Sequence, residues 1–89
     1  MNIEFDPRKD EANTEKHGVS LADAARLEWD WVWAIEDFRN DYGERRMIGY
    51  GPIADRVYCV VYTERKGIRR IISLRKANRR EVRLYADKI

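Results

Sequence analysis

Arginine, lysine, tyrosine and glutamate supply most of the side chains that could do chemistry in this 89-residue chain. His17 is its only histidine and Cys59 its only cysteine, which excludes an internal disulfide and a Cys-rich zinc site. No carboxylate pair has the spacing of a metal motif, and no glycine-rich phosphate loop is present. Ser73 also lacks the flanking glycines of a hydrolase nucleophile. We therefore expect no metal and no cofactor.

This set of side chains suits the cleavage of RNA without a metal. In that reaction the ribose 2′-OH attacks the adjacent phosphorus, and the protein must assist proton removal, phosphorane formation and departure of the 5′-oxygen. Arginines can stabilise the phosphorane charge, and the candidates for base or acid are His17, Glu44, Glu64 and Tyr85. His17 has the most suitable ordinary pKa of the four.

The basic residues are unevenly distributed along the chain. Residues 1–55 contain seven Lys/Arg and thirteen Asp/Glu, whereas residues 56–89 contain eleven Lys/Arg and three Asp/Glu. Arginine predominates in the second stretch, and its planar guanidinium suits two-point binding of phosphate. A polyanionic partner is one explanation of this pattern, and a solvated surface that pairs with the acidic first half is the other.

Length and composition indicate one small domain. Hydrophobic residues make up 44% of the chain and charged residues 38%, a mixture typical of a globular protein. No apolar run approaches the roughly 20 residues of a membrane span, and the first residues lack the layout of a secretion signal. We expect a cytoplasmic protein with no membrane partner.

Capping signals predict two helices near the beginning of the chain. A short strand over residues 2–5 is followed by Asp6-Pro7, a typical helix start, and we predict a helix over residues 7–16 with Gly18 at its C-terminal cap. Ser20 begins a second predicted helix that ends near residue 28.

The rest of the chain is mainly β. Alternation and β-branched residues predict strands over residues 29–36, 46–50, 56–65 and 68–75, and a closing helix over residues 76–86. This order predicts an α+β fold: a small antiparallel sheet of four to five strands, two N-terminal helices and one C-terminal helix. We expect the helices to cover one face of the sheet and to leave the other open. Strict alternation places Arg70 and Arg75 on opposite faces of their strand.

Several segments, in order along nearly the whole chain, resemble the BrnT family of bacterial toxins. The most specific are KHGVS at 16–20 and RIISLRKA at 70–77. The others are IEFDP at 3–7, DYGERR at 41–46, VVYTER at 60–65, and Glu81 with Tyr85. Leu21 stands where Phe is common in the family, and Leu74 where Ala is usual, but both changes stay apolar.

The resemblance implies a RelE-like ribonuclease fold and a toxin of a type II toxin–antitoxin module that cleaves RNA and inhibits translation. It also implies a BrnA-like antitoxin with a ribbon-helix-helix part, through which the pair would contact operator DNA. For an RNA-cleaving toxin of this kind we predict the catalytic residues His17, Glu44, Arg65 and Arg75. We predict as RNA-binding residues Lys16, Arg45, Arg70, Arg79, Arg80 and Tyr85.

These assignments assume that the guanidinium groups of the late strands converge on one exposed patch, so that Arg75→Ala and Arg65→Ala both abolish toxicity. Each candidate also has a structural alternative, as a solvated charge, a partner in an ion pair or, for Tyr85, a packed ring. We expect the tryptophans at 29, 31 and 33 to lie in the hydrophobic core or in the interface with the antitoxin. The alternative functions are a nucleic-acid-binding module without catalysis and an inactive family member that binds an antitoxin and acts as co-repressor.

Overall fold

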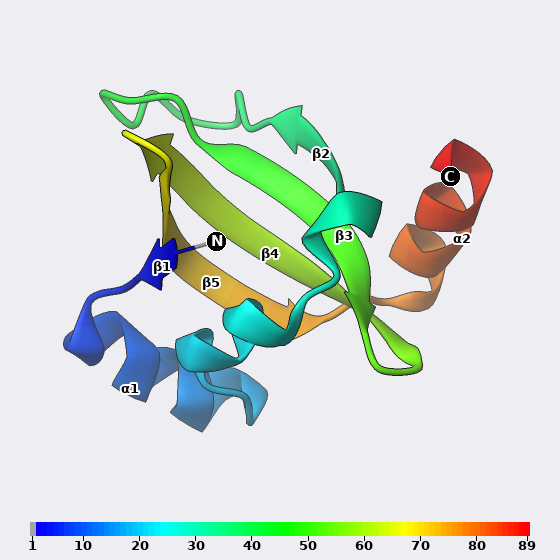
Figure 1. Cartoon of the computed structure of the whole chain (residues 1–89), viewed down its shortest axis with the longest axis horizontal. Helices are drawn as coiled ribbons and strands as arrows, with labels where there is room; N and C mark the ends of the chain where they lie inside the picture. The colour runs from blue at the N-terminus through cyan, green and yellow to red at the C-terminus, as the bar shows by residue number, and fades with distance from the viewer. Residues whose placement is uncertain (1) are drawn as a thin grey trace.

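The fold is built on one five-stranded sheet, seen in a computed structural model that describes residues 2–89 (Figure 1). Its elements are β1 (Asn2–Glu4), α1 (Pro7–His17), η1 (Leu21–Arg26), η2 (Trp29–Trp31), β2 (Trp33–Glu36), β3 (Met47–Ile53), β4 (Arg56–Arg65), β5 (Ile68–Lys76) and α2 (Arg79–Lys88), where η marks a 3₁₀ segment. The α+β class is confirmed. No helix among residues 2–89 is both long and apolar enough to span a membrane.

The sheet is mixed, so the expectation of an antiparallel-only sheet is wrong. The strand order is β1-β5-β4-β3-β2, and β1 pairs parallel to β5, with Ile3 opposite Arg69. A parallel pair needs a long crossover, which the chain from α1 to β4 supplies here. Because this pairing joins segments that are far apart along the chain, alternation within β1 carries no information about the direction of the pairing.

Capping determines α1 as predicted. Asp6 precedes the helix and its carboxylate accepts the backbone N–H of Arg8 at 2.9 Å, with Pro7 at the first helical position. Gly18 ends the helix in the left-handed conformation, at φ 72°, and its N–H donates to the Thr14 carbonyl at 2.8 Å. The helix therefore ends at His17, one residue later than predicted.

The predicted second N-terminal helix is a 3₁₀ segment. Ser20 caps it by accepting the Ala22 N–H, but η1 ends at Arg26 and buries Leu21 and Ala24, three residues apart. That spacing fits the three residues per turn of a 3₁₀ helix. The strand predicted over residues 29–36 is also divided: Trp29 to Trp31 form η2, because the Trp31 N–H donates to Glu28, and β2 begins only at Trp33.

The boundaries of β3 and α2 also differ from prediction. β3 starts at Met47 and continues to Ile53, so the turn lies at Ala54-Asp55 instead of Gly51 to Asp55. The closing helix begins at Arg79, because Asn78 and Glu81 form a reciprocal capping box. Lys76 still belongs to β5, where it lies opposite Tyr58.

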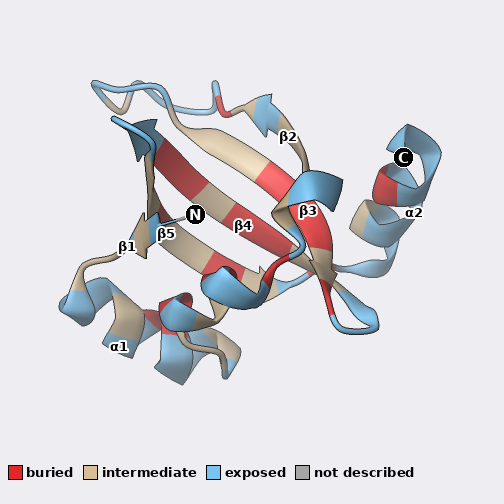
Figure 2. Ribbon diagram, viewed as in Figure 1, coloured by how far each residue is buried: buried red, intermediate tan, exposed pale blue. Residues whose placement is uncertain are grey.

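Two apolar clusters lie on opposite faces of the sheet. The larger one lies under η1, and Figure 2 shows buried segments along the middle strands. Its buried members are Leu21, Ala24, Leu27, Ile53, Val60, Tyr62, Ile71 and Leu74. The smaller cluster joins Tyr85 of α2 to Tyr50 and Cys59 on the other face. The expectation that all helices cover one face is therefore wrong, because α2 packs on the face that η1 leaves free.

A bulge in β5 changes which of its residues share a face. Tyr62 lies opposite Ile71 and Val61 opposite Ser73, so Ile72 has no residue opposite it. Arg70 consequently lies opposite Thr63, on the same face as Arg75, which lies opposite Cys59. Strict alternation had placed Arg70 and Arg75 on opposite faces, and the extra residue is the reason that this prediction is wrong.

Asn13 closes the part of the β5 edge that β1 leaves unpaired. Its side-chain amide donates to the carbonyls of Val19 and Leu74, both at 2.8 Å, and its oxygen accepts the Leu74 N–H at 3.1 Å. The residue is 6% exposed, so these bonds are shielded from water.

We expect Asn13→Ala to lower the free energy of unfolding by about 2–3 kcal/mol, because two backbone groups of the β5 edge and a carbonyl lose their partner. Urea unfolding of the purified protein measures this loss. Thr14→Ala on the exposed side of α1 is the matched control. A loss no larger than the control's would contradict the assigned role.

Candidate functional site

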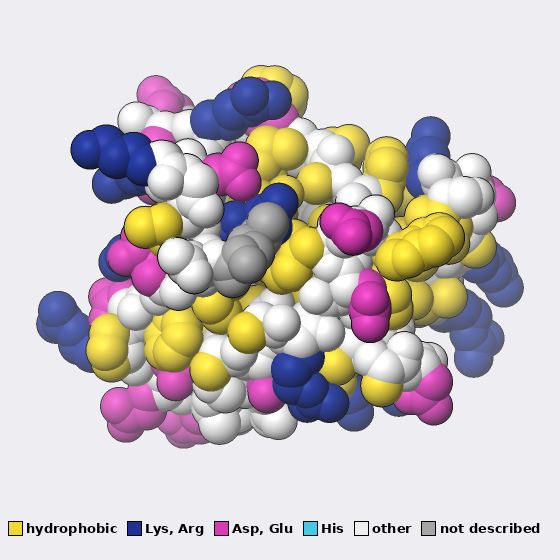
Figure 3. Space-filling model, viewed as in Figure 1, with side chains coloured by type: hydrophobic (Ala, Val, Ile, Leu, Met, Phe, Trp, Pro, Cys, Tyr) yellow, Lys and Arg dark blue, Asp and Glu magenta, His cyan; other side chains and the backbone are white. Residues whose placement is uncertain are grey.

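A hollow of about 300 Å³ lies on the sheet face opposite η1. Ile48, Cys59 and Val61 are its apolar lining. Its polar lining comes from the end of α1, the loop after β2, three strand positions and α2: Lys16, His17, Arg39, Tyr50, Ser73, Arg75 and Glu81. Figure 3 shows the side that carries η1 and η2, where Lys and Arg side chains lie mainly around the edge. The hollow is thus where cations from separate elements meet.

His17 and Lys16 reach the hollow because Gly18 ends α1 directly after them. The pKa of His17 is lowered from its ordinary value of 6.5, first by partial burial and then by the positive charges of Lys16 and Arg75. Its imidazole is therefore mainly neutral at pH 7, the form that accepts a proton. Lys16, His17 and Arg75 all line the hollow, so three basic side chains lie around one site.

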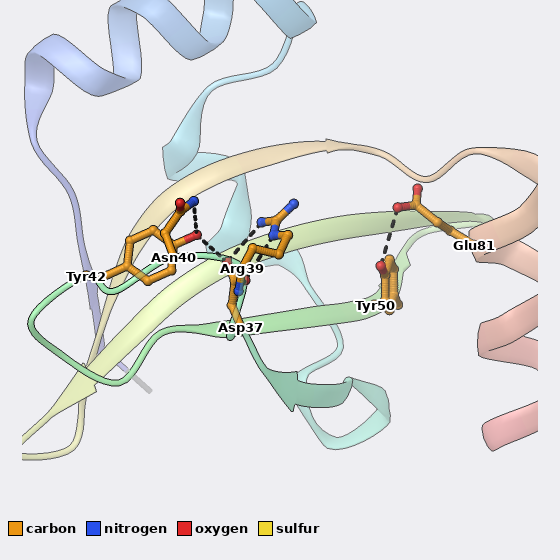
Figure 4. A network of polar contacts seen from close by, with 6 residues as sticks. All are labelled: Asp37, Arg39, Asn40, Tyr42, Tyr50 and Glu81. Atoms are coloured by element: carbon orange, nitrogen blue, oxygen red, sulfur yellow. Dashed lines mark hydrogen bonds and ion pairs between the residues drawn. The ribbon is translucent and has the colours of Figure 1, made fainter.

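Arg75 is held by a carboxylate of α2. Its guanidinium donates two hydrogen bonds of 2.8 Å to the two carboxylate oxygens of Glu81. The Tyr50 hydroxyl donates to the same carboxylate at 3.3 Å, as Figure 4 shows. These contacts, led by the Arg75 hydrogen bonds, lower the pKa of Glu81 to about 2, and burial is the main reason that the pKa of Tyr50 rises to about 12. At neutral pH Glu81 is therefore ionised and Tyr50 keeps its proton.

Arg39 is a member of the site that sequence reasoning missed. The carboxylate of Asp37, whose side chain is fully buried, accepts bonds from the Arg39 Nε and Nη2, both at 2.9 Å, and from the Tyr42 hydroxyl (Figure 4). The Arg39 hydrogen bonds hold the pKa of Asp37 far below its usual range. Asp37 therefore anchors Arg39, and no local motif connects this loop to the hollow.

The other predicted arginines of the late strands lie elsewhere. Arg75 lies opposite Cys59 of β4, and Arg65 is six residues further along that strand, opposite Ile68. The strand positions of Arg65 and Arg75 are therefore about 20 Å apart. Arg65 pairs with Glu44 at 2.6 Å, and Arg70 pairs with Glu4 at 3.3 Å. The expected convergence on one patch is wrong, because a hairpin places the end of one strand beside the start of the next.

The remaining candidates also lie outside the hollow. Arg45 pairs with Glu36 at 2.9 Å, and the pKa of Glu44 is lowered chiefly by its hydrogen bond from Arg65. Arg79 and Arg80 are exposed at the start of α2. Tyr85 is buried, and its hydroxyl donates to the Trp31 carbonyl at 2.6 Å. Of the ten predicted site residues, the hollow thus brings together Lys16, His17 and Arg75.

The tryptophans divide between core and surface. Trp29 packs edge-on against Tyr62 and donates its indole N–H to Ala24, and Trp33 stacks on Tyr50. Trp31, by contrast, is 59% exposed. Among residues 2–89, no group of three or more His, Cys, Asp or Glu side chains is placed to hold a metal ion.

One comparison with known proteins identifies the family. The model of the family described as the ribonuclease toxin BrnT of type II toxin–antitoxin systems matches residues 5–81. No curated protein matches the chain. The match includes every polar residue that lines the hollow, from Lys16 to Glu81.

Proposed function

This chain belongs to the BrnT family of type II toxin–antitoxin ribonuclease toxins, and from that premise we propose that it is an endoribonuclease whose reaction takes place in the hollow. The observation that carries the proposal is the position of His17, a neutral imidazole beside Lys16 and Arg75. A base next to cations is the arrangement needed to deprotonate a hydroxyl beside a phosphate.

In the proposed reaction His17 takes the proton of the ribose 2′-OH, and the 2′-oxygen forms a bond to the adjacent phosphorus. The bond from phosphorus to the 5′-oxygen breaks, and that oxygen takes a proton from solvent water, which leaves a 2′,3′-cyclic phosphate and a free 5′-OH. Arg75, Arg39 and Lys16 stabilise the additional negative charge of the phosphorane. No metal ion takes part in these steps.

We assign the other predicted arginines to RNA binding away from the cleaved link. Arg45, Arg65 and Arg70 are at least partly exposed, and such a guanidinium can exchange a carboxylate for a phosphate. Glu44 remains ionised and serves to hold Arg65. Arg79 and Arg80 extend the basic surface from α2, whereas Tyr85 has a packing role.

The proposed partner is a BrnA-like antitoxin with a ribbon-helix-helix part, which would contact operator DNA on behalf of the pair. Membership in a toxin–antitoxin family supports an antitoxin partner. Trp31 at 59% and Phe38 at 80% exposure offer apolar surface of the kind that protein partners cover. RNA cleavage by the free toxin would inhibit translation. We also propose that the fold is related to that of RelE-like ribonucleases.

The test is cleavage of RNA by the purified protein in EDTA. We expect the same rate as in Mg²⁺, products with 2′,3′-cyclic phosphate ends, and no cleavage where the 2′-OH is replaced by hydrogen. That deoxy substrate is the control for a contaminating nuclease of another mechanism. A folded protein that binds RNA without cutting it would support the non-catalytic alternative, and activity that requires Mg²⁺ would contradict the metal-free step.

A further inference from the structure

A second hollow continues the first along α1. It has a volume of about 280 Å³ and lies between one face of the helix and β5, at Ile72 and Ser73. The helix contributes positions 9, 12, 13, 16 and 17, a spacing that places them on a single face. Lys16, His17 and Ser73 line both hollows, so the two form one groove.

Lys9 is at the far end of this groove. It lies seven residues before Lys16, so the backbone positions of the two lysines are two helical turns, about 10 Å, apart along the axis. With their side chains extended away from each other, the two lysines would contact different phosphates of the same strand. Neither lysine has an ion pair among residues 2–89, in contrast to Arg65, Arg70 and Arg75.

The lining between the lysines suits a nucleotide. Ala12 and Ile72 give an apolar surface beside the cations, and the amide of Asn13 is already engaged by Leu74 and Val19. Proteins that bind single-stranded RNA combine a positive groove with aromatic side chains on which bases stack. In this hollow the cations lie beside the aliphatic surface of Ala12 and Ile72 instead. Each hollow is at the small end of ligand sites, which fits one splayed nucleotide better than a duplex.

We propose that the α1–β5 hollow binds the nucleotide next to the cleaved link, with Lys9 holding a neighbouring phosphate, so that the substrate is single-stranded RNA of several nucleotides. This inference rests on the proposed function for the position of the cleaved link. It predicts that affinity depends on the length of the RNA and on the charge of Lys9.

The experiment compares Lys9→Glu with Arg8→Glu, which changes the net charge equally on the same helix but outside both hollows. The probe is a fluorescent 2′-O-methyl RNA octamer, which cannot be cut by 2′-OH attack. We expect Lys9→Glu to weaken binding about tenfold and Arg8→Glu much less. Lys9→Ala should lower the salt slope of binding by about 0.7, as expected for one lost phosphate contact with a single strand. A 2′-O-methyl dinucleotide, too short to reach Lys9, should bind both glutamate variants equally.

The outcomes separate this inference from the proposed function. Equal loss of octamer affinity in the two glutamate variants would overturn the groove, even if the wild type cuts RNA. A duplex that binds as tightly as the single strand would overturn it as well. A wild type that binds the octamer through Lys9 but cuts no unmodified RNA would overturn the nuclease proposal alone.

Discussion

Replacing Arg75 by alanine is expected to lower the rate of RNA cleavage about 10²–10³-fold, the effect of losing one fixed charge that stabilises a phosphorane. Arg75 is the one arginine of the late strands in the hollow, and the two hydrogen bonds that its guanidinium donates to Glu81 hold it in place. Single-turnover cleavage of a defined RNA measures the effect on chemistry apart from binding.

The alanine variant leaves Glu81 without its cation, so loss of stability has to be separated from loss of chemistry. Arg75→Ala/Glu81→Gln removes both charges, and glutamine still serves in the capping box with Asn78. We expect the double variant to fold with a melting temperature near that of the wild type and to cleave as slowly as Arg75→Ala. A well-folded double variant with the wild-type rate would contradict the role of Arg75.

Alanine variants of two other arginines serve as comparisons for Arg75→Ala. Arg26→Ala, on the η1 side of the sheet, makes the same substitution outside both hollows and should leave cleavage unchanged. Arg65→Ala, about 20 Å along the hairpin from Arg75, should raise KM more than it lowers kcat. The sequence predicts that both Arg65→Ala and Arg75→Ala lose toxicity, whereas the register of the hairpin leads us to expect different effects.

Replacing His17 by alanine is expected to slow cleavage about 10²–10⁴-fold, the usual contribution of a positioned general base. For the wild type, kcat/KM should fall about tenfold per pH unit below the pKa of His17, because only the neutral imidazole accepts the 2′ proton. That pKa is lowered below 6.5, so the rate should already be on its plateau at pH 7. The measurement is kcat/KM over a pH range in which circular dichroism shows intact fold.

Lys16→Ala tests the direction in which the acid limb of the pH profile moves. A purely structural role of His17 predicts no such shift. Lys16 is one of the charges that lower the pKa of His17, so its removal should move the acid limb of the profile to higher pH. Weaker RNA binding changes the height of the plateau, whereas the position of the acid limb reports on His17. A limb that stays in place in Lys16→Ala, or that persists in His17→Ala, would assign the titration to another group.

The sequence by itself determined the elements whose signals are local. Asp6-Pro7 and Gly18 set the two ends of α1, and thereby the place of Lys16 and His17 at its end. The alternating β-branched residues of 56–65 and 68–75 predicted the β4–β5 hairpin almost to the residue. The ordered segments also identified the BrnT family, which the family model confirms. The signals for α1 and for the hairpin arise from neighbours within a few residues of one another.

Which charged side chains lie together depends on contacts between segments that are far apart along the chain. One unpaired residue, Ile72, moves Arg70 to the face of Arg75, yet the hairpin register keeps Arg65 and Arg70 far from the hollow. Buried Asp37 brings Arg39 into the site from a loop, and β1 pairs parallel to β5 across most of the chain length. The physical reason is the same in each case: a contact between distant segments depends on register and burial, and neither is encoded in the periodicity of one segment.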